Sequence, residues 1–333
     1  MQIYIKDRKR RKEEFQFFMH DFVDACKKNG FKSKPDLIPD YRWHYRALLR
    51  DVFFCFYSFI HHAFPSFIKR KRALLIAANG STIKDIAFPY FFNYEIVPFL
   101  WDVWPYSHGR LFKSLKDFDV KYIFVTSSQI ATLINLNTST KAFWIPEGIK
   151  SSHYVNNKKL SERKCDVFEM GRQLGCYHCI LNKMAISGKI ASYRTSNIQK
   201  EGNLDDKNVA YSNEELYYMI SDTKIMICFP KCDTNKKNAG NIETLTQRYW
   251  EAMLSGCVMV GRAPKELIDL IGYNPVIDVD WNGPERQIID IIDNINRYQS
   301  IVDKNYETAK KYADWDNRLP EILKILSNCG YII

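Results

Sequence analysis

Short, continuously apolar segments that alternate with amphipathic stretches restrict the fold of this 333-residue chain more than any other feature. Residues 73–78 form such a segment and end at Asn79-Gly80, which predicts a buried parallel strand followed by a turn. Further strands are expected at residues 95–101, 122–126 and 142–145. An alternation of strands with helices indicates a doubly wound α/β domain.

The same alternation returns in the second half of the chain. Strands are expected at 166–170, 224–229 and 258–260, and helices at 214–220, 242–254, within 285–313 and at 319–326. The polar stretch 150–164 is interpreted as an interdomain connection. We therefore expect an α/β protein with two Rossmann-like doubly wound domains that face a central cleft. Their boundaries are residues 1–155 and 156–315, and residues 316–333 form a C-terminal helix that packs back on the first domain.

Glu243 and Glu251 form a Glu-x7-Glu pair within the helix expected at 242–254. On a helix, their offset separates the carboxylates by about 12 Å along the axis and about 80° around it. Carboxylates that far apart cannot share a proton or bind one metal ion, but they can accept hydrogen bonds from an elongated, hydroxyl-rich ligand. Amides at the helix start suit a phosphate. A sugar, a ribose and phosphates in this order describe a nucleotide-sugar.

Positive charge is concentrated in the N-terminal part of the chain. The formal net charge is +10, and residues 1–72 contain 17 Lys or Arg against 8 Asp or Glu. The remaining residues are nearly neutral, which argues against a nucleic-acid partner. A local basic region suits an anionic membrane surface or a polyprenyl phosphate. The first dozen residues lack an apolar core segment, so we expect no secretory signal and a cytoplasmic location.

The most apolar segment, residues 47–68, is followed by the basic run Lys69-Arg70-Lys71-Arg72. It includes Arg50, Asp51 and Pro65, so we do not expect it to span a membrane. Two interpretations stay open. The segment is either a core helix of the first domain or an aromatic helix that lies peripherally on the inner face of the cytoplasmic membrane.

The nine cysteines are scattered, and most lie among apolar residues, as buried free thiols in a reducing compartment do. Cys176 and Cys179 flank His178 and form a zinc-like cluster, but a second pair at ligand spacing is missing from the sequence. We therefore expect no bound metal and no cofactor.

Residues 226–267 resemble the signature of retaining GT-B glycosyltransferases of family four and its relatives. In that signature a strand ends in Phe-Pro, a polar loop leads to Glu-x7-Glu, and an Ala-Met-x-x-Gly tail, an apolar strand and Pro-x-Glu-Leu follow. This chain has Phe229-Pro230, Ala252-Met253 and Pro264-Lys265-Glu266-Leu267 at those places. Weaker similarities occur at Trp144–Ile149, Phe168–Arg172 and Leu100–Pro105.

The resemblance implies roles for individual residues. Glu243 would contact the transferred sugar, Glu251 the ribose, and Arg172 the diphosphate. The same resemblance places further donor contacts at Lys183, Gly240, Asn241, Thr244, Leu245 and Thr246, and catalytic acceptor-side residues at Asp102 and His108. Family members usually have glycines where Thr244 and Thr246 stand, and a lysine near the position of Tyr177.

Taken together, these features predict an enzyme that moves a sugar from a nucleotide-diphosphate sugar to a glycan or polyprenyl-linked oligosaccharide in bacterial surface polysaccharide synthesis. The resemblance implies a metal-independent reaction that retains the anomeric configuration. Asp278-Val279-Asp280 imitates the Asp-x-Asp metal site of another glycosyltransferase fold, but it follows a strand of the wrong architecture. Two alternatives stay open: a degenerate nucleotide-sugar-binding or scaffold subunit, and a nucleotide-sugar epimerase of the same architecture.

Overall fold

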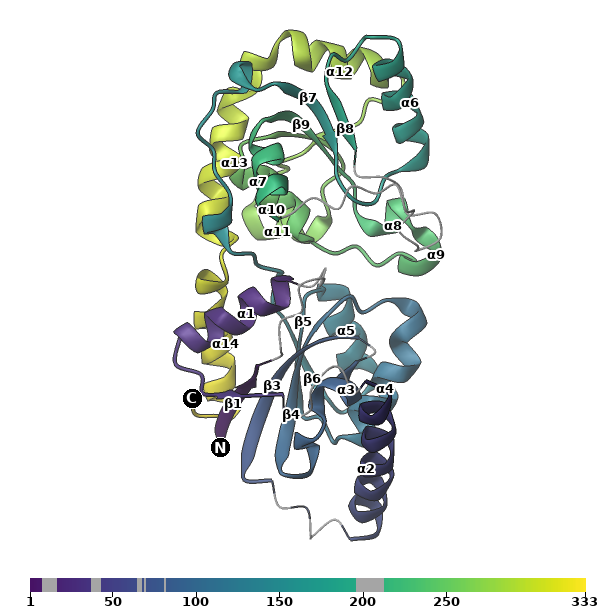
Figure 1. The fold of residues 1–333 in the computed structure, drawn as a ribbon, viewed down its shortest axis with the longest axis vertical. Helices are drawn as coiled ribbons and strands as arrows, with labels where there is room; N and C mark the ends of the chain where they lie inside the picture. The colour runs from purple at the N-terminus through teal and green to yellow at the C-terminus, as the bar shows by residue number, and fades with distance from the viewer. Residues whose placement is uncertain (8–16, 37–42, 65–67, 69, 81, 196–212) are drawn as a thin grey trace. The chain divides into compact units, whose positions relative to one another are not determined.

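The computed structural model describes residues 1–7, 17–36, 43–64, 68, 70–80, 82–195 and 213–333 (Figure 1). The chain divides into two compact units. The first comprises Met1–Pro146 and Trp315–Ile333, and the second comprises Glu147–Asp314. The chain enters the second unit at residue 147 rather than 156, because the residues that follow already bond within it. The amide of Ile149 donates to the carbonyl of Ala313 at 2.8 Å.

The first unit is built on a six-stranded parallel sheet with the order β2-β1-β3-β4-β5-β6. Its strands are β1 (Gln2–Lys6), β2 (Ser33–Lys34), β3 (Arg72–Asn79), β4 (Tyr94–Trp101), β5 (Tyr122–Val125) and β6 (Lys141–Trp144). All eight residues of β4 are buried, because helices cover both faces of a parallel sheet. The strands expected at 73–78, 95–101, 122–126 and 142–145 are present with bounds that differ by one residue.

Six α-helices belong to the described part of the first unit. They are α1 (Phe17–Lys28), α2 (Trp43–Ala63), α3 (Ile83–Ala87), α4 (His108–Asp117), α5 (Ser128–Asn137) and α14 (Trp315–Asn328). Helices α1 and α14 lie side by side although they come from opposite ends of the chain (Figure 1). Trp315 of α14 packs edge-on against Phe22 of α1 and against Phe99 and Trp101 of β4. The C-terminal helix therefore completes the core of this unit.

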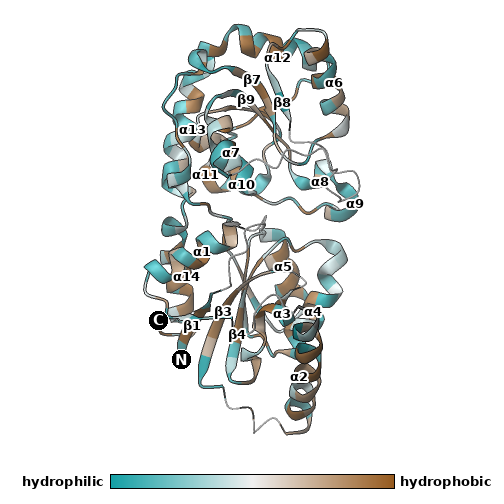
Figure 2. Cartoon of the chain, in the orientation of Figure 1, coloured by the Kyte–Doolittle hydropathy of each residue, from teal (hydrophilic) through white to brown (hydrophobic). Residues whose placement is uncertain are grey.

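Helix α2 has a buried side and an exposed apolar side. Tyr57 is fully buried and contacts Phe91 and Phe118, whereas Phe56 and Phe59 are 59% and 63% exposed. Figure 2 shows hydrophobic residues along the length of this helix. Within the described residues, no helix combines the length and the hydrophobicity that crossing a bilayer requires.

The second unit contains a five-stranded parallel sheet with the order β11-β10-β9-β7-β8. The strands are β7 (Cys165–Glu169), β8 (Tyr193–Thr195), β9 (Thr223–Cys228), β10 (Val258–Gly261) and β11 (Ile277–Asp278). Successive residues of β9 point to opposite faces, as the two-residue period of a strand requires. Met226 and Cys228 join one apolar cluster, and Ile225 and Ile227 join the other.

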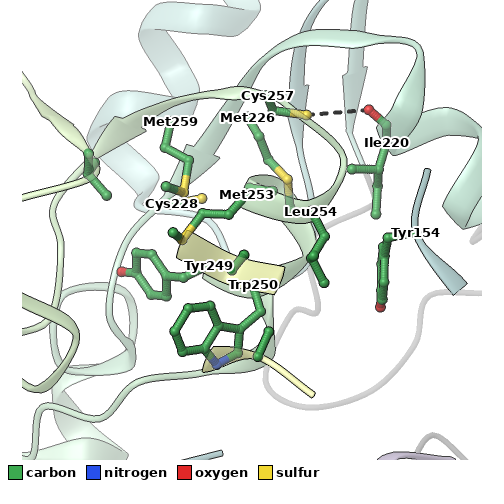
Figure 3. Packing of buried hydrophobic residues seen from close by; sticks show 14 of the residues in the cluster. Tyr154, Ile220, Met226, Cys228, Tyr249, Trp250, Met253, Leu254, Cys257 and Met259 are labelled. Carbon is green, nitrogen blue, oxygen red and sulfur yellow. Dashed lines mark hydrogen bonds between the residues drawn. The ribbon is translucent and has the colours of Figure 1, made fainter. Parts of the chain in front are cut away.

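The helices of the second unit cover both faces of this sheet (Figure 1). They are α6 (Gly175–Ile186), α7 (Asn213–Ser221), α8 (Lys231–Thr234), α9 (Lys236–Ala239), α10 (Gln247–Leu254), α11 (Lys265–Ile271), α12 (Pro284–Asp293) and α13 (Gln299–Tyr312). Helix α10 is central to one cluster. Its Tyr249, Trp250 and Met253 are fully buried beside Met226 and Met259 (Figure 3).

We predict that Trp315→Ala destabilises the first unit by about 3–5 kcal/mol, because it removes a buried aromatic side chain that packs against Phe22, Phe99 and Trp101. Urea denaturation followed by circular dichroism measures this loss. The control is Leu136→Ala on the same unit, where the side chain is 79% exposed and the expected change is within about 0.5 kcal/mol. Equal effects of the two substitutions would contradict the assignment of α14 to this core.

Candidate functional site

The order of the second sheet defines a topological switch point at the carboxyl ends of β7 and β9. From β7 the chain continues to β8 on one side, and it returns to β9 on the other side. Ligands of open α/β sheets bind at such a switch point, outside the carboxyl ends of the two strands. Strand β7 ends at Glu169 and leads to Gly171-Arg172, and β9 ends at Cys228 and leads to Phe229-Pro230. Arg172 therefore stands where this topology places a ligand.

The turn that carries Arg172 is held from two sides. Gly171 has a φ of 71°, in the left-handed region that favours glycine. On one side, the Gln173 amide donates a hydrogen bond to the Thr195 hydroxyl at the end of β8. On the other side, the Arg248 guanidinium of α10 donates to the carbonyl oxygen of Arg172 at 3.3 Å. The Arg172 side chain itself is exposed.

The helix expected at 242–254 is wrong in its first half. Helix α9 ends at Ala239 and is followed by Gly240, which has a φ of 58°, and α10 begins only at Gln247. Thr246, the residue before α10, is extended, with φ −114° and ψ 162°. Glu243 thus lies in the non-helical segment between the two helices, and the helical spacing of 12 Å and 80° does not describe the Glu243/Glu251 pair. Asn241 lies in the same segment and is exposed.

Glu243 is paired with a cation. Its carboxylate accepts a hydrogen bond from Nη1 of Arg262, the residue that follows β10. The same guanidinium also donates two hydrogen bonds, of 2.7 and 2.8 Å, to Asp233 of α8. These two acids raise the pKa of Arg262, and the hydrogen bonds that it donates to Asp233 have the largest effect. One arginine therefore orients both carboxylates. Neither Arg262 nor Asp233 stood out in the sequence as a site residue.

The backbone amide of Leu245 already has an acceptor. It donates a hydrogen bond of 2.9 Å to Glu266 of α11, and both residues are buried. Thr244 is buried as well. This amide is therefore directed into the unit rather than toward a diphosphate. The amides of the first turn of α10 belong to Gln247, Arg248 and Tyr249.

Glu251 lies on the buried side of α10 and is 5% exposed. The hydroxyl of Tyr154 donates to its Oε1 at 2.9 Å. Burial raises the pKa of Glu251, and this hydrogen bond together with the positive charge of Arg248 acts against the rise. Glu251 is thus a buried carboxyl group with a fixed orientation, rather than a freely solvated one.

Lys183 lies in the third turn of α6 and is exposed. Gly175 begins α6 and is the helix residue closest to β7 in the sequence. Helix geometry places Lys183 about 12 Å along the axis from Gly175. Tyr177, in the first half of the same helix, is fully buried against Phe229 and Trp281 and offers no cation. Lys183 thus lies about two turns along α6 from its start, and the described residues show no contact between Lys183 and the Gly171-Arg172 turn.

His178 interacts with Glu169 and Tyr193 rather than with the two cysteines beside it in the sequence. Its Nδ1 lies 2.6 Å from Oε2 of Glu169, and the Tyr193 hydroxyl donates to the same oxygen at 2.7 Å. Cys176 and Cys179 are exposed free thiols. In the part of the chain that the structure describes, no three His, Cys, Asp or Glu side chains gather in a metal-binding arrangement, and this includes Asp278 and Asp280.

Asp102 and His108 lie beyond the carboxyl end of β4 in the first unit. Asp102 is exposed, has a φ of 48° and accepts a hydrogen bond of 3.1 Å from the Trp104 indole. This left-handed backbone is strained for a residue other than glycine, which is typical of functional loops. His108 opens α4 and stacks on Phe112, and burial lowers its pKa, so its imidazole is neutral at physiological pH.

The fold of this chain is similar to that of several solved structures. No family model and no curated protein matches the sequence. Among solved structures, Anabaena HepE in complex with UDP and glucose matches with a TM-score of 0.58 at 11% identity, over 98% of this chain and 100% of that one. A Rickettsia africae glycosyltransferase matches with a TM-score of 0.53 at 10% identity, over 98% of each chain.

A third similar structure is TarM, with a TM-score of 0.53 at 12% identity over 82% of this chain. The match spans 58% of the TarM chain, so this protein corresponds to little more than half of it. The two parallel α/β units and these neighbours show that the chain has the GT-B glycosyltransferase fold. The expected fold class is confirmed.

We predict that Glu251→Gln stabilises the second unit more at pH 8 than at pH 4. A native pKa above the unfolded value of about 4.3 means that the contribution of Glu251 to stability is fully present below that pH and is lost as the pH rises through the native pKa. Glutamine keeps an acceptor for Tyr154 and does not ionise. Scanning calorimetry of both proteins across this pH range measures the difference in Tm.

The control for this prediction is Glu307→Gln, an exposed glutamate of α13 in the same unit. Its difference from the unaltered protein should vary little with pH. If the Glu251→Gln difference were constant or became smaller toward pH 8, burial would not govern the ionisation of Glu251.

Proposed function

We propose that this protein is a glycosyltransferase that moves a sugar from a nucleotide-diphosphate sugar to a glycan or a lipid-linked oligosaccharide. The observation that carries this proposal is the Gly171-Arg172 turn at the switch point of a GT-B sheet. Helix α10 contacts this turn through the hydrogen bond of Arg248, and the segment that contains Glu243 directly precedes α10 in the chain. The solved complexes of HepE with UDP, glucose and UDP-glucose support a nucleotide-sugar as the donor.

The charges of the site match those of the reaction. Cleavage of a sugar–phosphate bond leaves negative charge on the diphosphate, and a preorganised cation and helix amides stabilise that charge. Arg172 supplies the cation, and the first turn of α10 supplies amides and the positive end of a helix dipole. The donor therefore binds with its diphosphate at this turn.

Glu243 is assigned to the transferred sugar. An ionised carboxylate is a strong acceptor for sugar hydroxyls, and its orientation by Arg262 fixes the direction in which it accepts. Glu251 is assigned to the ribose. On the acceptor side, the exposed Asp102 and the neutral His108 bind the incoming hydroxyl group. The leaving phosphate takes the proton of that hydroxyl, so the new bond forms on the face from which the phosphate departs and the anomeric configuration is retained.

We predict that Glu243→Gln lowers the rate of sugar transfer by about tenfold or more, whereas the affinity for the nucleoside diphosphate changes little. The amide that replaces the carboxylate removes a charge-assisted hydrogen bond worth about 1.5–3 kcal/mol to the sugar alone. Turnover assays with a panel of UDP-, GDP-, ADP- and CMP-sugars, together with calorimetric titration of the free nucleotides, separate the two effects.

Glu307→Gln is again the matched control, and it should leave both quantities unchanged. Unaltered turnover of the Glu243 variant would remove Glu243 from the site. The anomeric configuration of the product, read by NMR, tests retention. The rival functions give other results in the same assay. A degenerate binding subunit binds the donor without turnover, and an epimerase interconverts donor sugars without an acceptor.

The exposed side of α2 supports a peripheral membrane location as part of this function. Tyr45, Leu48, Val52, Phe56 and Phe59 are 57–70% exposed and lie within an arc of about 80° on the helix. Tyr57, which is buried, lies about 180° from Leu48. Single exposed apolar residues are ordinary, but a continuous stripe of aromatic and aliphatic side chains marks an interaction surface.

The charges around this stripe favour an anionic lipid surface as its partner. Arg50 lies off the stripe and pairs with Asp51 and Asp85. Lys71 and Arg72 follow α2 in the chain and are exposed; Lys69 lies outside the described residues. An apolar helix face flanked by basic residues is suited to the interface of an anionic membrane. These features support our proposal of an acceptor on a lipid carrier of bacterial surface polysaccharide synthesis, at the cytoplasmic face.

We predict that the protein floats with vesicles that contain phosphatidylglycerol, and that two separate double variants weaken this binding by about tenfold or more. Phe56→Ser with Phe59→Ser removes apolar contact, and Lys71→Glu with Arg72→Glu removes attraction worth about 1 kcal/mol for each basic residue. Leu136→Ser, at an exposed leucine of α5, is the control. Binding that survives both double variants would contradict this assignment.

A further inference from the structure

A second guanidinium lies at the turn that carries Arg172. Arg248 occupies the first turn of α10, and its Nη1 donates to the carbonyl of Arg172 at 3.3 Å. The guanidinium lies against the α-carbon of Gly171, where a Cβ would collide with Nη2. The missing side chain of Gly171 therefore leaves the room for this approach, and its positive φ is also in the region that favours glycine.

Arg248 forms no ion pair with a carboxylate of the described residues, although its charge lowers the pKa of the buried Glu251. No Asp or Glu of the described residues lies within salt-bridge distance of its guanidinium. Its Nε is buried and has no hydrogen-bond partner among the same residues. By contrast, Arg262 in the same unit is paired with both Asp233 and Glu243. A half-buried guanidinium with only a carbonyl oxygen to bind retains donors and charge for an anion.

The position of Arg248 in its helix makes this arrangement costly without an anion. A cation in the first turn of a helix is opposed by the positive end of the helix dipole and by the N–H groups that point in the same direction. An anion bound at the same place interacts favourably with the amides, the dipole and the guanidinium together. The helix start and the arginine therefore favour the same ligand.

We infer that Arg248 is a second ligand of the donor diphosphate, acting with Arg172 across the Gly171 turn. This inference rests on the proposed function. Tyr177, near the position where the family has a lysine, is buried and carries no cation, and Lys183 lies about 12 Å along α6 from its start. Helix α10 supplies the cation instead. Two planar guanidinium groups can each bind phosphate oxygens in a bidentate manner, which a lysine cannot do.

The experiment is a calorimetric titration of the full-length protein with UDP, GDP and ADP, and with the corresponding nucleosides. In Arg248→Met, the affinity for the diphosphate that binds the unaltered protein should fall by about ten- to hundredfold, the effect of losing one or two charge-assisted hydrogen bonds. The affinity for the nucleoside should stay the same, because it has no phosphate to contact Arg248. A purely structural role would weaken both ligands.

Two further variants complete the test. Arg297→Met removes an exposed arginine of the same unit and should leave both affinities unchanged. Arg248→Lys keeps the charge and guards against misfolding of the methionine variant. It should bind the diphosphate with an intermediate affinity and the nucleoside normally.

The outcomes separate this inference from the proposed function. If the unaltered protein binds a diphosphate and Arg248→Met and Arg248→Lys bind it equally well, the role of Arg248 is overturned and the proposed function stands. If none of the nucleotides binds the unaltered protein, the proposed function is overturned, and the role of Arg248 with it.

Discussion

The pairing of β7 with β9 is the constraint on which the candidate site depends. It places two strands that are far apart in the sequence next to each other and leaves their carboxyl ends open at one edge of the sheet. Gly171-Arg172 follows one strand, and the segment that leads to Glu243 and α10 follows the other. Helix α10 packs its buried side on β9 and β10, which fixes its first turn relative to the strand ends (Figure 3).

The two acids of the site have interaction partners of their own within the second unit. Glu243 is compensated by Arg262, and Glu251 is held by a hydroxyl donor within the core. Two carboxylates near a diphosphate would otherwise repel it. Because Glu243 pairs with Arg262 and neither acid forms an ion pair with Arg248, the same unit can present acceptors to a sugar and cations to a phosphate.

Local sequence patterns predicted most of the fold, because buried parallel strands are continuously apolar. They missed β1, in which Ile3 and Ile5 are fully buried and Lys6 is buried as well. A lysine suggests a surface, but the ammonium group of Lys6 donates to the carbonyls of Ile86 and Phe88 at 2.6 and 2.7 Å. Those partners lie some eighty residues away, so a local pattern cannot reveal them.

The candidate site could be predicted in part for a similar reason. Arg172 and the two glutamates stand out in the sequence, yet the helix start was placed too early. The hydrogen bond from Leu245 to Glu266 and the ion pair from Arg262 to Glu243 hold that segment in a non-helical path, and both join residues about twenty positions apart. Arg248 carried no local signal, because a helix over 242–254 puts it in the middle, and only the later start at Gln247 places this cation in the first turn.

The division of the chain also bears on how the protein is made. The second unit is an insertion between Pro146 and Trp315, and the core of the first unit needs Trp315 and Leu319. During synthesis, residues 147–314 emerge complete while the sheet of the first unit still lacks α14. Because domains fold as units when their residues become available, the unit that holds the N-terminus is the later one to finish folding.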